Sequence, residues 1–157
     1  MYNKVLVPLD GSQFSQCSLD HVRAIARGCN VPEVVLLRVV EPLSSPDIAG
    51  LAQAEGNSIA QVESENEAEA KDYISSMAKR LSEEGLSVKS EVVSGKADEV
   101  IVDYARKNRI DLIIMSSHGR SGISRWVMGS VADRVMRYSI VPVLLVPTPG
   151  CRIAQGL

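Results

Sequence analysis

Residues 111–146 read DLIIMSSHGRSGISRWVMGSVADRVMRYSIVPVLLV, and this stretch indicates the fold. It begins with a short apolar run over 111–115, which is typical of a buried strand. A polar segment with small residues follows, after which Val131, Val135 and Tyr138 mark a helix. A second apolar run occupies 141–146. A strand, a loop, a helix and a further strand in this order form one unit of a parallel α/β sheet.

The same alternation extends toward the N-terminus. Apolar runs predict strands at 4–9 and 33–40 and around 86–92, while helical spacing is present over 22–29, 70–81 and 97–104. This order predicts a Rossmann-like α/β fold, an open sheet of five parallel strands with helices on both faces. The strand around 86–92 alternates with polar residues, and prolines flank the last strand, so both are placed at edges. The strand order 3-2-1-4-5 satisfies these constraints.

Composition narrows the class of protein. The 157 residues are expected to form a single domain over 1–150 with a C-terminal tail at 151–157. The net charge of −2 gives no electrostatic case for binding nucleic acid or an anionic membrane. There is no signal-peptide pattern, and no apolar run approaches the roughly 18 residues of a membrane span. Cys17, Cys29 and Cys151 match neither a metal site nor a redox motif, so a cytoplasmic location is expected.

The predicted strand order places a ligand site at one edge of the sheet. Open α/β sheets bind ligands at the carboxyl ends of the strands where the order reverses, here after 8–12 (PLDGS) and 115–122 (MSSHGRSG). The last helix begins near Gly129-Ser130, and its first N–H groups favour an anion such as phosphate. Gly and Ser are equally typical of an ordinary loop and a helix cap, so the residues alone leave both interpretations open.

Two common nucleotide motifs are missing from the sequence. It contains no GxxxxGK[ST], because Gly95-Lys96-Ala97 lacks both the upstream glycine and the Ser or Thr. It also lacks GxGxxG after the first strand. Neither a P-loop nor an NAD site is therefore supported.

The chain resembles the universal stress protein family over nearly its whole length, from KVLVPLD at 4–10 to VPVLLV at 141–146. ATP-binding members carry the pattern Gly, two residues, Gly, nine residues, Gly, then Ser or Thr. Gly119, residues 120–128 and Gly129-Ser130 match this pattern. Ser116 stands where the pattern has its first Gly, and its Cβ restricts the backbone there.

The resemblance implies a site for ATP, or for ADP or AMP, with Mg²⁺. Adenine is expected near Val39, Met115 and Pro8, and Asp10 is expected to contact the ribose or a phosphate-bound Mg²⁺. The N–H groups at the start of the last helix are expected to meet the phosphates. The full set of expected binding residues is Pro8, Leu9, Asp10, Val39, Met115, Ser116, His118, Gly119, Gly129, Ser130, Val131 and Ala132.

Three functions are consistent with these features. The favoured one is a nucleotide-binding regulatory protein of the stress response, with slow or no ATP hydrolysis because His118 is the sole candidate base. The alternatives are an enzyme, either a slow ATPase or a nucleotidyl transferase, and a dimeric interaction protein that binds no nucleotide, for which Ser116 is the support. The resemblance also implies a homodimer through Val143 to Val146, whose apolar edge invites pairing, and an unidentified protein partner.

Overall fold

The computed structural model describes residues 1–43, 59–118 and 128–147. Its centre is a five-stranded parallel sheet of order β3-β2-β1-β4-β5, which confirms the predicted order and both predicted edges. The strands are β1 (Lys4–Pro8), β2 (Glu33–Val40), β3 (Val88–Ser94), β4 (Leu112–Ser116) and β5 (Val143–Val146). From β1 the chain adds β2 and β3 on one side and then β4 and β5 on the other. The order of strand addition therefore switches between β1 and β4, where the ligand site was expected.

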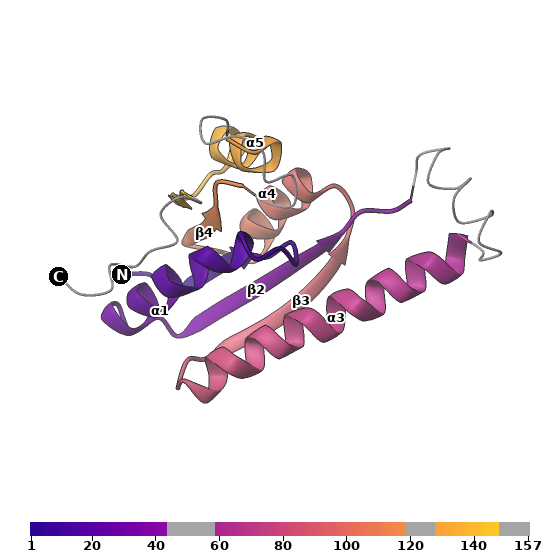
Figure 1. The fold of residues 1–157 in the computed structure, drawn as a ribbon. Helices are drawn as coiled ribbons and strands as arrows, with labels where there is room; N and C mark the ends of the chain where they lie inside the picture. Colours follow the sequence, from indigo (N-terminus) through magenta and orange to yellow (C-terminus); the bar gives the residue numbers. More distant parts are fainter. Residues whose placement is uncertain (44–58, 119–127, 148–157) are drawn as a thin grey trace.

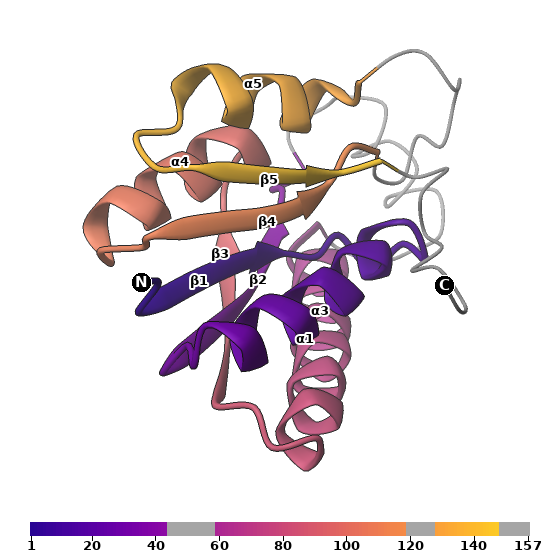
Figure 2. The ribbon, with the colours of Figure 1, turned by 90° about the vertical axis from the view of Figure 1, so that its left-hand side faces the viewer.

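Helices cover both faces of the sheet, as the sequence predicted. The short helix η1 (Ser15–Cys17) and α1 (Ser18–Gly28) follow β1, and α3 (Ile59–Glu83) precedes β3. Then come α4 (Ala97–Lys107) and α5 (Ser130–Tyr138). Figures 1 and 2 show α1 and α3 on one face and α4 and α5 on the other. Each crossover helix runs back against the strand direction, so the N-terminal turns of α3, α4 and α5 lie at the carboxyl edge.

Two aliphatic layers hold the sheet between these helices. On β2, Val34 and Leu36 pack with the residues of α1 and α3, while Val35 and Leu37 pack with those of α4 and α5. All four side chains are fully buried. Burial of one such side chain stabilises the fold by about 1.5–3 kcal/mol. The strand ends and helix starts are therefore held in fixed positions relative to one another.

The two edge strands differ from the centre. β3 is partly exposed along its whole length, in agreement with its alternating sequence. β5 begins at Val143 and not at 141, because Pro142 has no N–H for a ladder hydrogen bond; its carbonyl still accepts the Ile113 N–H at 3.0 Å. Val143, Leu144 and Leu145 are half-buried. The homodimer through this strand and the single-domain assignment stay predictions.

The described helices differ from membrane-spanning segments in length or polarity. Within residues 1–43, 59–118 and 128–147, none is both long and apolar enough to cross a bilayer. α3 has 25 residues, but charged side chains occur along its length. The cytoplasmic location stays a prediction.

Candidate functional site

A cavity of about 680 Å³ lies at the carboxyl ends of β1, β2 and β4. This volume is in the usual range of small-molecule sites, roughly 300–1,000 Å³. The middle of α3 and the N-terminal turns of α4 and α5 complete its walls. The cavity is lined by all of the predicted binding residues that the structure describes, namely Pro8, Leu9, Asp10, Val39, Met115, Ser116, His118, Gly129, Ser130, Val131 and Ala132. Gly119 lies outside the described residues.

The start of α5 provides donors to the cavity. Gly129 is the N-cap and carries no side-chain cap, so the first-turn N–H groups of Ser130, Val131 and Ala132 have no partner within the helix. The Gly129 N–H itself donates to the Ser117 carbonyl at 2.9 Å. The sequence analysis included the Gly129 N–H among the groups expected to bind phosphate. In the structure it is already used, so the donors are those of the following three residues.

Glycine at 129 is favoured by close packing. A Cβ added there would lie 3.1 Å from the Ser117 carbonyl oxygen and 3.7 Å from the Cα of His118. The first of these distances is tighter than normal van der Waals contact. The absence of a side chain therefore lets the end of β4 approach the start of α5, which brings two parts of the predicted site together.

The loop after β4 is fixed by its own side chains. The Ser116 hydroxyl donates to the His118 carbonyl at 2.7 Å, and the Ser117 hydroxyl lies 2.9 Å from Nδ1 of His118. The Ser117 N–H donates to the carbonyl of Val146 at 2.8 Å. The Ser116 hydroxyl is thus engaged within its own turn, and the His118 ring is oriented by its neighbour.

Asp10 forms a tight turn after β1. Its Oδ1 accepts the Ser12 N–H at 2.9 Å and the Ser12 hydroxyl at 2.6 Å, and Gly11 adopts a φ of 87°. These bonds form a local turn stabilised by an aspartate side chain, and they hold the carboxylate at the cavity wall. Among the described residues, no three His, Cys, Asp or Glu side chains are grouped to bind a metal ion. Mg²⁺ at Asp10 would therefore need phosphate and water for most of its ligands.

An apolar slot forms the α4 side of the cavity. Val39 at the end of β2, Met115 at the end of β4 and Ile101 of α4 line it, with exposed fractions of 9%, 6% and 2%. Aliphatic side chains and a methionine thioether give a polarisable surface without competing hydrogen-bond groups. Such a surface suits the face of a flat heterocycle.

Sequence reasoning missed the contribution of α3 to the cavity. Asn66, Glu69 and Tyr73 line it from this helix, together with Ser15 of η1 and Arg38 of β2. Burial raises the pKa of Tyr73, while the nearby Ser15 and Gln16 side chains partly offset the rise. The available signal was that α3 is a crossover helix packed on the sheet; its length places residues 66–73, in its middle, beside the carboxyl ends of the strands.

Comparisons with known proteins agree with this architecture. The chain is 35% identical over 155 residues to Universal stress protein MJ0577 of Methanocaldococcus jannaschii, covering 93% of this chain and 95% of the relative. It is 33% identical to Universal stress protein MJ0531 of the same organism, over 95% of this chain and 84% of the relative. The solved structure of MJ0577 superimposes with a TM-score of 0.78 at 32% identity, covering 94% and 96% of the two chains.

Two more distant structures share the fold and contain ligands. One is a universal stress protein in complex with cAMP, with a TM-score of 0.58 at 24% identity over 94% of this chain and 98% of that one. The other is a universal stress protein family protein from Arabidopsis thaliana with AMP bound, with a TM-score of 0.63 at 18% identity, covering 92% and 91%. The sequence profile of the Universal stress protein family matches residues 1–147, and the chain therefore belongs to this family.

Proposed function

We propose that the cavity binds an adenine nucleotide, with ATP as the expected ligand, and that the protein is a nucleotide-dependent regulator in the stress response. One observation carries this proposal. A single cavity of about 680 Å³ combines an apolar slot, a fixed carboxylate and an uncapped helix N-terminus. These three features are complementary to a base, a sugar and a phosphate chain.

The phosphate chain is assigned to the start of α5. The free N–H groups of Ser130, Val131 and Ala132 carry the partial positive charge of the helix end. Hydrogen bonds to a charged acceptor are each worth about 1.5–3 kcal/mol. This arrangement holds phosphate without the lysine of a P-loop.

The base and the sugar are assigned to the strand ends. The slot of Val39, Met115 and Ile101 receives the adenine ring, and Asp10 faces the ribose or a phosphate-bound Mg²⁺. The AMP and cAMP complexes of two proteins with this fold support the choice of adenine. Membership of the family supports the stress-response role.

Hydrolysis is expected to be slow or absent. A phosphoryl-transfer site needs a group that orients the attacking water and strong positive charge on the transferred phosphoryl group. In the described part of the cavity, His118 is the candidate base, and Arg38 is the cationic side chain present, on the α3 side. The nucleotide is then a signal that is bound and released, and the conformation is read by a partner protein.

Calorimetric titration tests the proposal. The wild-type protein is titrated with MgATP, AMP and GTP, and we expect micromolar binding of MgATP and weaker binding of GTP. Asp10→Asn should weaken MgATP about tenfold, because one charge-assisted contact worth about 1.4 kcal/mol is lost.

The matched control is Asp103→Asn, on the exposed surface of α4 and outside the cavity, which should leave the affinity unchanged. No binding of any adenine nucleotide at millimolar concentration would refute the proposal. Multiple-turnover release of phosphate that is lost in His118→Ala would replace the regulatory assignment with an enzymatic one.

A further inference from the structure

The cavity extends to the face of the sheet that α1 and α3 cover, beyond the groups assigned to base and phosphate. Tyr73 of α3 and Ser15 of η1 line this part, and Asp10 lines the same cavity. The ring of Tyr73 packs against the aliphatic layer beneath it. Tyr73 therefore lines the cavity with a side chain whose ring is anchored in the core.

Among the residues that the structure describes, the Tyr73 hydroxyl has no partner at hydrogen-bond distance and angle, although the Ser15 and Gln16 side chains lie close enough to act on its pKa. Its oxygen exposes less than 1 Å² to solvent. The neighbouring Ser15 hydroxyl donates to the carbonyl of Ser12 at 2.8 Å. Leaving a buried donor unpaired costs about 1–3 kcal/mol, and roughly nine in ten buried polar groups in proteins are paired. An exception at the wall of a binding cavity is explained if the ligand supplies the partner.

We infer that the Tyr73 hydroxyl recognises a ribose hydroxyl of the bound nucleotide, so that Tyr73 selects ribonucleotides over deoxyribonucleotides. This inference rests on the proposed function. A ribose hydroxyl both donates and accepts hydrogen bonds, as a phenol does, so the two groups are complementary. The ligand reaches the enclosed oxygen after a small shift of the tyrosine side chain toward the cavity that it already lines, since side-chain adjustments on binding are common.

The surrounding charges favour a neutral sugar over a phosphate at this position. The carboxylates of Asp10, Glu41 and Glu69 line the cavity, and among its described lining residues Arg38 carries the guanidinium, so acidic side chains outnumber it. Asp10 lies close enough for its charge to raise the pKa of Tyr73 further, after the larger effect of burial. The phenol therefore stays protonated near neutral pH and remains a donor. A phosphate would meet like charge, whereas a ribose hydroxyl would meet an acceptor in Asp10 and a donor in Tyr73.

Sugar-modified nucleotides test this inference. Wild type and Tyr73→Phe are titrated with MgATP, 2′-deoxy-ATP and 3′-deoxy-ATP. We expect wild type to prefer ATP about tenfold over at least one deoxy analogue, which corresponds to about 1.4 kcal/mol for one hydrogen bond. Tyr73→Phe should lose that preference by binding ATP about tenfold more weakly, while its affinity for the analogue stays unchanged.

A second readout separates this role from a structural one. In the free protein, Tyr73→Phe removes an unpaired buried hydroxyl, so its thermal midpoint should equal or exceed that of wild type. The matched control is Tyr104→Phe on α4, which removes the hydroxyl of a half-buried tyrosine outside the cavity. This control should leave all three nucleotide affinities unchanged.

The outcomes distinguish this inference from the function on which it rests. If wild type binds ATP and both analogues equally, or if Tyr73→Phe keeps the wild-type preference, the role of Tyr73 is overturned and nucleotide binding stands. A lower thermal midpoint for Tyr73→Phe would show that the hydroxyl is structurally bonded, which also overturns the inference. If wild type binds no adenine nucleotide, the proposed function and this inference both fail.

Discussion

The two ends of the parallel sheet differ in whether their polar groups are hydrogen-bonded within the chain. At the amino end, Oδ2 of Asp111 accepts the N–H groups of Asn3 at 2.6 Å and Lys4 at 2.9 Å. The Lys4 ammonium pairs with Glu33 at 2.9 Å. At the carboxyl end, the cavity is lined by a carboxylate, a tyrosine and an uncapped helix start. The amino end is thus closed by contacts within the chain, and the carboxyl end keeps groups for a ligand.

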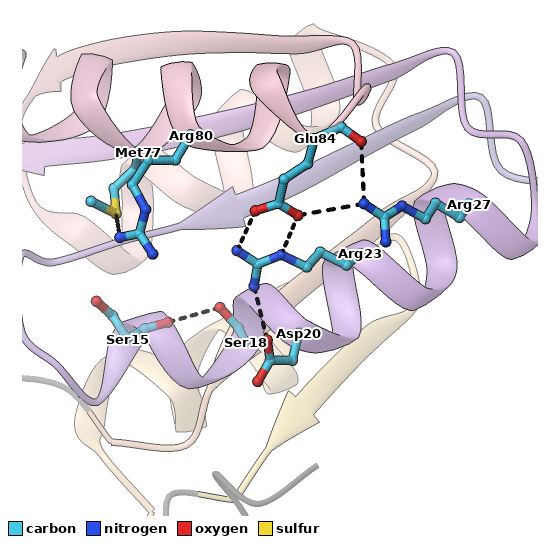
Figure 3. Close-up of polar contacts among 8 residues, drawn as sticks. All are labelled: Ser15, Ser18, Asp20, Arg23, Arg27, Met77, Arg80 and Glu84. Atoms are coloured by element: carbon cyan, nitrogen blue, oxygen red, sulfur yellow. Dashed lines mark hydrogen bonds and ion pairs between the residues drawn. The ribbon is translucent and has the colours of Figure 1, made fainter. Parts of the chain in front are cut away.

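Ion pairs within the chain also join α1 to the end of α3 near the amino end of the sheet. Arg23 of α1 donates two hydrogen bonds to the Glu84 carboxylate, which follows α3, at 2.7 and 2.8 Å, and a third to Asp20 at 2.8 Å (Figure 3). Arg27 lies 3.5 Å from the same Glu84 carboxylate. The difference between the ends shows how one fold separates stability from binding, because the polar groups named at the amino end are paired with one another, whereas the first N–H groups of α5 have no partner within their helix.

The strongest test of this division compares two glycines. Gly129→Asp puts a carboxylate beside the donors of α5, and its Cβ would lie 3.1 Å from the Ser117 carbonyl oxygen. We expect ATP affinity to fall at least about 100-fold, which corresponds to about 2.7 kcal/mol. The free energy of unfolding should change by no more than about 1 kcal/mol, because the close contact destabilises the fold while an aspartate at the N-cap stabilises α5. Calorimetry and urea unfolding measure the two effects.

The matched variant is Gly28→Asp, at the closed end. In the described part of the chain, no atom beyond the surrounding helix backbone lies within 4 Å of a Cβ at that position, so the change adds charge without a clash. Its ATP affinity should equal that of wild type. Equal losses of affinity in the two variants would mean that the ends of the sheet are not functionally distinct.

The next test removes a hydrogen-bonded contact at the amino end of the sheet. Asp111→Ala leaves the N–H groups of Asn3 and Lys4 without their shared acceptor, and the free energy of unfolding should fall by about 1–3 kcal/mol. ATP affinity should stay within about twofold of wild type, because the residue lies at the opposite end of the sheet. Asp111→Asn keeps an acceptor and should lose less stability. A tenfold loss of ATP affinity in Asp111→Ala would contradict the division.

The sequence predicted the strand order because each strand carries its own burial pattern. Continuous apolar runs such as 33–40 require cover on both faces, and the alternation near Val88 allows an edge. These patterns belong to each strand's own sequence and do not depend on contacts with distant segments. The crevice followed from the order alone, and the predicted binding residues that the structure describes do line one cavity there.

The part that the sequence did not predict depends on contacts between distant segments. Tyr73 lies in the stretch 70–81, where helical spacing predicted a helix with an apolar face, and its ring packs on the core accordingly. The position of its hydroxyl depends on where η1 lies against α3. The use of the Gly129 N–H by Ser117 likewise depends on how β4 meets α5. Helical spacing identifies the face of a residue and not the neighbour that its polar atom meets, so three-dimensional structure was needed for both.

The smallest expected effect belongs to the ion pair that joins α1 to the end of α3. A double-mutant cycle of Arg23→Ala and Glu84→Ala at about pH 7 should give a coupling of about 0.5–1 kcal/mol, since both side chains are partly exposed to solvent. ATP affinity should not change in any of the variants.

The pH dependence identifies the charge responsible for this coupling. The Arg23 hydrogen bonds lower the pKa of Glu84 below its ordinary value of 4.5, so the folded state favours the carboxylate. The stabilisation is then fully present above about pH 4.5 and is lost as the pH falls through the lower pKa of the folded state. Urea unfolding between about pH 7 and pH 3 should show the coupling decrease on acidification. A coupling that stayed constant over this range would mean that packing of the Arg23 side chain, and not its charge, joins the two helices at the closed end.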